Sequence, residues 1–68
     1  MTTFAQYQEA VKVAMRKRRG LRKGQTFFDV LSEMEPELAH RLTDTADDPF
    51  YDDAKLPQFL THVAQELR

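Results

Sequence analysis

The sequence contains no cysteine, a single serine and no long hydrophobic run, and each absence excludes a class of protein or site. Without cysteine, the chain can form neither a disulfide framework nor a cysteine-based zinc site, which fits a reducing compartment. No apolar stretch approaches the roughly 20 residues that span a bilayer. The start MTTFAQYQEA also lacks the pattern of a secretion signal. We therefore expect a cytoplasmic protein that does not enter a membrane.

Catalytic and metal chemistry also have few residues to work with. Ser32 lies in no Gly-x-Ser-x-Gly turn, no glycine-rich phosphate loop occurs, and His40 and His62 fall in different predicted helices. Five aspartates between positions 44 and 53 could attract a hard cation. Their spacing, however, lacks the central glycine and the closing glutamate of a calcium loop. We expect no enzyme, no metal site and no cofactor.

Length and composition describe one small globular domain. A chain of 68 residues buries only about 60% of its unfolded surface, so its core is small and its stability margin narrow. Apolar residues make up 41% and charged residues 31%, which is too apolar for a disordered tail. Residues 1–68 are therefore expected to form a single helical domain.

Helical spacing of apolar residues dominates the first half of the chain. The first helix is predicted to begin after Thr3, because Thr3 and Gln6 have the spacing of a capping box, and to end at Gly20. The second helix is predicted to start near Thr26. It should end at Glu35, because Pro36 disfavours helical geometry in the residue before it and starts a short third helix.

A loop from Thr43 to Asp53 precedes the last helix. Within it, Asp48 is predicted to cap a single helical turn that begins at Pro49. Asp52 and Asp53 are predicted to flank the start of the last helix, where the positive end of the helix dipole favours them. Two aromatic residues of this loop are predicted to pack inward and pin it to the core, namely Phe50 and Tyr51.

No segment alternates with the period of a strand, and no Asn-Gly or Asp-Gly hairpin signal occurs. The predicted fold class is all-α, a small single-domain bundle of three main helices plus one or two short helical turns. Leu21 is expected to fold back on Met15 at the end of the first helix. The predicted core consists of Phe4, Tyr7, Val11, Met15, Phe27, Phe28, Leu31, Leu38, Leu42, Phe59, Leu60 and Val63.

Three segments occur in a recognisable order: GLRKGQ, MEPELAHRL and DDPFYDDAKLPQFL. Together they resemble a group of small uncharacterised helical proteins of phages, prophages and bacteria that share the pattern G-L-R-x-G-Q, P-x-L and D-P-F-Y. The similarity covers roughly residues 20–62. It implies a compact helical fold and a phage or bacterial setting, and it carries over no catalytic residue.

Charge is distributed very unevenly along the chain. Residues 1–24 hold seven Lys/Arg and one acid (+6), whereas residues 25–68 hold three Lys/Arg and ten acids (−7), which together give the net charge of −1. The stretch RKRRGLRK, residues 16–23, contains six of the ten basic residues. Cations at a helix C-terminus are favoured by its dipole, so part of this run has a purely structural explanation.

The excess of positive charge leads to the functional hypothesis. We expect a small non-enzymatic protein that binds another protein, one with an acidic surface, through Arg16, Arg18, Arg19, Arg22 and Lys23. The alternative is non-specific binding of a nucleic-acid backbone by the same residues. Self-association into a homo-oligomer is a further possibility, since a small core gains from burying more surface. If the acidic segment pairs internally with the basic cluster, no function follows.

Overall fold

The structure is a computed structural model, and it describes residues 2–17 and 20–67 of the chain. Its elements are α1 (Phe4–Lys17), α2 (Lys23–Met34), α3 (Pro36–Leu42), a single 3₁₀ turn η1 (Asp53–Lys55) and α4 (Leu56–Leu67). No strand occurs within these described ranges. The predicted all-α fold, with three long helices and short helical turns, is confirmed.

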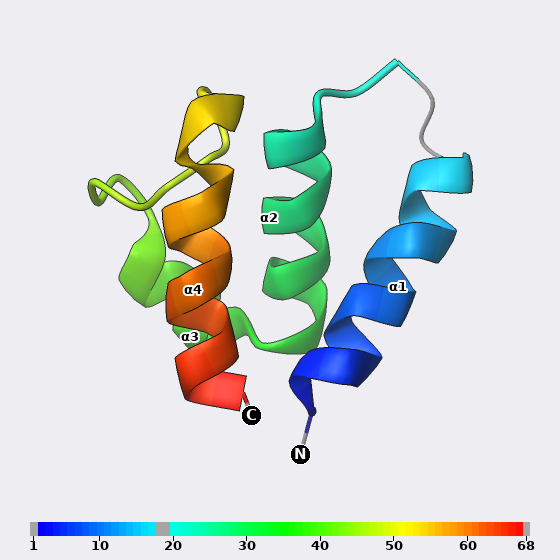
Figure 1. Cartoon of the computed structure of the whole chain (residues 1–68), viewed down its shortest axis with the longest axis horizontal. Helices are drawn as coiled ribbons and strands as arrows, with labels where there is room; N and C mark the ends of the chain where they lie inside the picture. The colour runs from blue at the N-terminus through cyan, green and yellow to red at the C-terminus, as the bar shows by residue number, and fades with distance from the viewer. Residues whose placement is uncertain (1, 18–19, 68) are drawn as a thin grey trace.

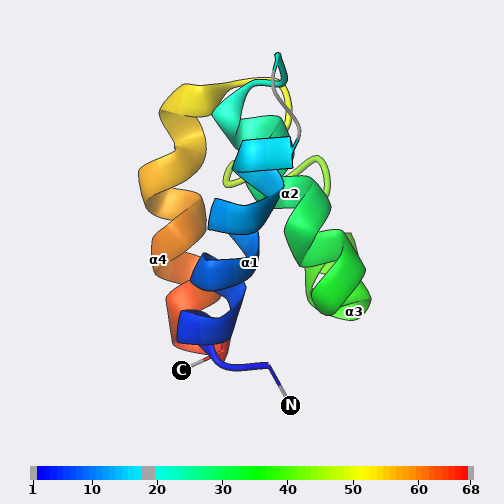
Figure 2. The same ribbon diagram turned by 90° about the vertical axis from the view of Figure 1, so that its right-hand side faces the viewer.

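Figure 1 shows α1 and α2 running antiparallel, with α4 beside them and both termini at the same end of the molecule. Residues 20–22, which lead into α2, and the turn η1 both lie at the opposite end, where η1 contacts α2, and Figure 2 shows the same arrangement from the side. α3 packs against α2 and projects away from α1 and α4 (Figure 2). The start of α2 and the end of the acidic loop are therefore neighbours in space.

The predicted limits of α1 are set by local chemistry. The Thr3 N–H donates to Gln6 Oε1 (3.0 Å) and the Gln6 N–H donates to Thr3 Oγ1 (3.1 Å), which is the reciprocal capping box. Gly20 has a φ of 95°, the left-handed conformation predicted for it, and the described part of α1 extends to Lys17. Met15 and Leu21 are 37% and 42% exposed, so the predicted core position of Met15 and its cover by Leu21 are wrong.

Most of the predicted core is confirmed. The fully buried centre contains Tyr7, Leu31, Phe59 and Val63, and the Tyr7 hydroxyl donates to the Phe27 carbonyl oxygen at 2.6 Å. Around this centre the other buried hydrophobic residues are Val11, Phe28, Val30, Leu38, Ala39 and Leu42, with Phe4, Phe27 and Leu60 half-buried against them. Helical periodicity located these residues because one face of each helix meets the others.

The start of α2 differs from the sequence prediction. The helix begins at Lys23, three residues before Thr26, and Arg22 is its N-cap in extended geometry without a side-chain cap. Thr26 instead lies inside the first turn, buried, and its hydroxyl donates to the Arg22 carbonyl oxygen. The predicted end of α2 is confirmed, because Glu35 leaves helical geometry before Pro36 starts α3.

The loop also departs from its prediction. The helical turn lies at η1, where Asp52 accepts a hydrogen bond from the Ala54 N–H, and not at Pro49. Asp48 organises the loop differently, by accepting from the backbone N–H groups of Asp44 (2.8 Å) and Phe50 (2.9 Å). Phe50 is half-buried against Phe28, as predicted. Tyr51 is 75% exposed, so its predicted burial is wrong.

Candidate functional site

The predicted contact residues fall around the α1–α2 connection. Arg16 and Lys17 occupy the last turn of α1 and Lys23 is the first residue of α2, and all three side chains are exposed. No ion pair of these three cations occurs within the described part of the chain. Arg18 and Arg19 lie outside the described residues.

Arg22 makes contacts within the chain. Its guanidinium donates to the carbonyl oxygens of Tyr51 (2.8 Å) and Phe50 (2.6 Å), 29 and 28 residues further along. The fork of a guanidinium suits two acceptors held in fixed positions, here two successive carbonyl groups. Arg22 therefore ties the end of the acidic loop to the start of α2.

Asp53 ties the same two segments together from the other side. Its carboxylate Oδ1 accepts a hydrogen bond from the Gly24 N–H (3.0 Å), one of the free donors in the first turn of α2. Gly24 is buried, and a Cβ on it would collide with the Pro49 carbonyl oxygen and lie 2.8 Å from Asp53 Oδ1. Glycine is required here by close approach of the loop backbone. We call the contact of Arg22, Gly24, Pro49, Phe50, Tyr51 and Asp53 the α2–loop junction.

The α2–loop junction joins two of the three segments that carried the resemblance in sequence. GLRKGQ supplies Arg22 and Gly24, and DDPFYDD supplies the groups that they contact. Within the described ranges no ion pair links the basic stretch to the acidic loop. The two segments are instead joined by charge-assisted hydrogen bonds to backbone groups. Sequence reasoning missed the junction, and its one local signal was a glycine in the first turn of a helix.

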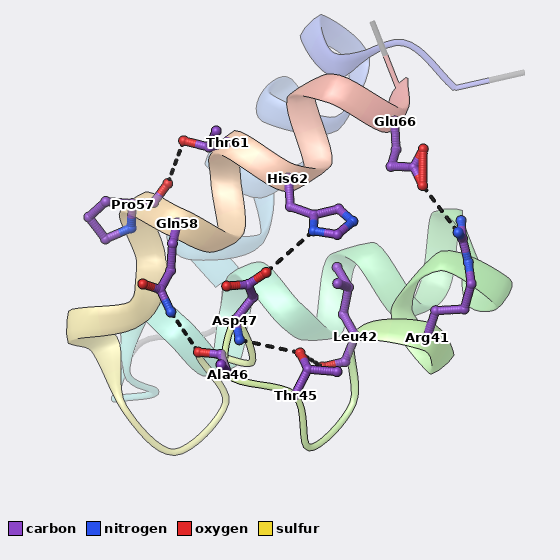
Figure 3. A network of polar contacts seen from close by, with 10 residues as sticks. All are labelled: Arg41, Leu42, Thr45, Ala46, Asp47, Pro57, Gln58, Thr61, His62 and Glu66. Carbon is purple, nitrogen blue, oxygen red and sulfur yellow. Dashed lines mark hydrogen bonds and ion pairs between the residues drawn. The ribbon is translucent and has the colours of Figure 1, made fainter.

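The loop is also anchored on α4, as Figure 3 shows. Gln58 donates to the Ala46 carbonyl oxygen (2.6 Å), and His62 Nδ1 lies 3.3 Å from Asp47 Oδ2. Elsewhere in the same view Arg41 of α3 and Glu66 of α4 form an ion pair at 3.1 Å. These exposed contacts contribute little each, about 0–1 kcal/mol, but the first two hold the loop, and the third holds α3, against α4.

The histidine and carboxylate side chains form no metal-binding cluster in the described part of the chain. No group of three or more His, Asp or Glu side chains that could hold a metal ion occurs in residues 2–17 and 20–67. His40 is exposed on α3, and His62 lies on α4 beside Asp47. No helix in the described part of the chain has the length and apolar character needed to cross a membrane.

Replacing Arg22 by methionine tests the role of the α2–loop junction. Methionine keeps an unbranched side chain and loses both hydrogen bonds, so we expect the free energy of unfolding to fall by about 1–2 kcal/mol. Urea unfolding followed by circular dichroism measures this change. The matched control Lys23→Met removes the neighbouring exposed cation and should leave stability within about 0.5 kcal/mol. Equal effects of the two variants would contradict a structural role for Arg22.

In comparisons with known proteins, no family model, no curated protein and no solved structure matches this chain.

Proposed function

We propose that this chain is a small non-enzymatic, cytoplasmic protein that binds another protein bearing an acidic surface. The contact residues are the basic cluster at the α1–α2 connection: Arg16, Arg18, Arg19, Arg22 and Lys23. The resemblance to small phage and bacterial proteins makes a bacterial cell the setting in which the partner is to be sought. Complementary charge of this kind governs the rate and specificity of association more than its affinity.

The exposed positive charge of Lys23 at the start of α2 is the observation that supports the proposal. Arg16 and Lys17 stand at the C-terminus of α1, where the dipole favours cations, so their presence has a local explanation. Lys23 stands in the first turn of α2, where the dipole disfavours a cation, and it is exposed without an ion-pair partner among the described residues. Positive charge thus stands at a position where it does not stabilise the helix, which favours a role in binding.

The surroundings of Lys23 favour a protein over a nucleic acid. The N-terminus of a helix is a natural site for a phosphate, but at α2 the Asp53 carboxylate already accepts from the Gly24 N–H. Asp29 and Glu33 follow on the same helix, so a recognition helix would bring carboxylates to the phosphates. A uniform polyanion would be repelled by this mixture of charges, whereas a protein surface can match it.

The proposal is tested by removing charge in two matched sets. The cluster variant carries Arg16→Gln and Lys23→Gln, and it leaves Arg22 in place because Arg22 hydrogen-bonds to the loop. The control variant carries the same two-charge change at exposed positions outside the basic cluster, namely Lys12→Gln and Arg41→Gln. Tagged forms of both variants and of the unaltered chain are used to capture proteins from bacterial lysate, in parallel with and without nuclease treatment.

We expect the unaltered chain and the control variant to capture a partner protein in an amount comparable to their own. The cluster variant should capture at least about 90% less of this partner. Equal capture by all three chains would refute the assignment of the cluster. Loss of all captured material on nuclease treatment would instead favour the nucleic-acid alternative. In that case affinity should fall steeply with salt on DNA of any sequence.

A further inference from the structure

A second surface, of opposite charge, lies where the loop meets α2. It is an open pocket of about 250 Å³ between the C-terminal end of α3, the loop and one side of α2. Its lining contains three aromatic side chains and two carboxylates and no basic residue: Phe28, Thr43, Asp44, Asp48, Phe50 and Tyr51. We call it the aromatic–acidic pocket. None of the residues of the proposed basic cluster lines it.

The aromatic walls of this pocket are held in place by the rest of the fold. The rings of Phe28 and Phe50 are nearly perpendicular (87°) with centroids 6.0 Å apart, and those of Phe50 and Tyr51 are 4.7 Å apart. Arg22 fixes the backbone of both loop aromatics through their carbonyl oxygens. The exposed Tyr51 ring therefore stands on an anchored backbone, beside two rings that are mostly buried.

The carboxylates differ in how much of their hydrogen-bonding capacity is left. Both oxygens of Asp48 accept backbone N–H groups within the loop. The Asp44 carboxylate is exposed and makes no hydrogen bond or ion pair within the described residues. Its backbone has a φ of 60°, a left-handed conformation that only a few residue types other than glycine adopt readily, Asp and Asn among them. One free carboxylate thus stands at the edge of an aromatic pocket.

This combination suits an organic cation better than an anion or a metal ion. No cationic side chain lines the pocket to hold an anion, and two carboxylates would repel one. A hard metal ion needs about six oxygen ligands, whereas Asp48 is already engaged and three of the six lining side chains are aromatic. Ring faces attract cations through their quadrupole, and a planar guanidinium also stacks on them while it pairs with a carboxylate.

We infer that the aromatic–acidic pocket receives an arginine side chain of another polypeptide, with the guanidinium against Tyr51 and paired with Asp44. The site has the opposite sign of charge to the basic cluster and does not depend on the function proposed for that cluster. The inference predicts a preference in the order arginine, then lysine, then an uncharged analogue of arginine.

The test is a titration of the ¹⁵N-labelled protein, at low salt, with three blocked amino acids followed by amide chemical shifts. The probes are N-acetyl-arginine amide, N-acetyl-lysine amide and N-acetyl-citrulline amide, the last being an uncharged isostere of arginine. We expect saturable shifts centred on Thr43, Asp44, Phe50 and Tyr51 with the arginine probe, with a dissociation constant on the order of 1–10 mM. The lysine probe should bind more weakly and the citrulline probe should cause no saturable shift.

Single substitutions inside and outside the pocket test whether the arginine probe binds in the aromatic–acidic pocket. Asp44→Asn keeps the left-handed backbone conformation and removes the charge. It should therefore weaken binding of the arginine probe about threefold to fivefold. Tyr51→Leu should weaken binding of the arginine probe by a similar factor, because the ring face is lost. Asp47→Asn removes the same charge from the same loop, but Asp47 faces His62 on α4 (Figure 3) and does not line the pocket. This control should leave binding unchanged.

Three results would overturn the inference. One is equal shifts with the arginine and citrulline probes, which would remove the role of charge. Another is an equal loss of binding in Asp44→Asn and Asp47→Asn, which would mean diffuse attraction to the acidic loop without a defined site. Absence of any saturable shift in the unaltered protein would likewise reject the pocket as an arginine site.

Discussion

Replacing Gly24 by alanine is expected to lower the free energy of unfolding by about 2–3 kcal/mol, even though alanine is the better helix former. The intrinsic gain from alanine in a helix is about 1 kcal/mol. Against it stands a collision of the new Cβ with the Pro49 carbonyl oxygen and a close approach to Asp53 Oδ1. The first of these is backbone, which cannot move aside as a flexible side chain can, so the loop must shift and its hydrogen bond to the Gly24 N–H is weakened.

Such a loss would remove a large part of the stability of a domain this small, for which a total of about 3–5 kcal/mol is typical. Urea unfolding measured by circular dichroism gives the value. Gly20→Ala is the control, because nothing lies within 4 Å of its added Cβ and only the φ of 95° opposes it. We expect Gly20→Ala to lower the free energy of unfolding by about 1 kcal/mol. A Gly24→Ala variant as stable as the unaltered chain would contradict the close packing of the loop on α2.

The second large change in the free energy of unfolding is expected in alkaline solution, and it depends on Tyr7. Burial raises the pKa of the Tyr7 hydroxyl far above its ordinary value, because the phenolate would lose its hydration in the core. The unfolded chain releases this proton at about pH 10, whereas the folded chain keeps it. Above pH 10 the unfolded state therefore binds fewer protons, and stability falls by about 1.4 kcal/mol for each further pH unit.

Tyr7→Phe isolates this contribution from the other groups that titrate at high pH. At neutral pH the variant should be less stable by about 1 kcal/mol, because it lacks the hydrogen bond to the Phe27 carbonyl oxygen. Its stability should decline less steeply above pH 10, so the two stability curves are expected to cross about one pH unit higher. Urea unfolding at a series of pH values tests this. Parallel curves over the whole range would show that Tyr7 does not carry the alkaline effect.

Several features of the fold could be predicted from the sequence because their causes are local. The Thr3–Gln6 capping box, the left-handed Gly20 and the break before Pro36 all involve residues within a few positions of one another. The core residues followed from helical spacing, since a helix buries the side chains that recur on one face. Met15 was the exception, because α1 buries only part of its apolar side.

The candidate sites could be predicted only in part. The sequence gathered the basic residues into one stretch, but it did not distinguish Arg22, which hydrogen-bonds to the loop, from Lys23, which stays exposed. It placed Phe50 and Tyr51 beside the acidic residues of the loop but did not predict the aromatic–acidic pocket. Phe28 lies on α2, whereas Asp44 and Tyr51 follow it in the loop by 16 and 23 positions, and they meet only when the loop packs back on the helix.

The sequence by itself therefore determined where helices form and end and which of their faces are buried, because those outcomes depend on residues three or four positions apart. The tertiary structure alone decided that α2 starts at Lys23 instead of Thr26, and that the Asp53 carboxylate, in the turn that leads into α4 as predicted, also accepts from the Gly24 N–H of α2. The physical reason is that the free N–H donors of a helix accept any suitably placed partner. Here the partner is 29 residues away, and no local pattern specifies a contact across that separation.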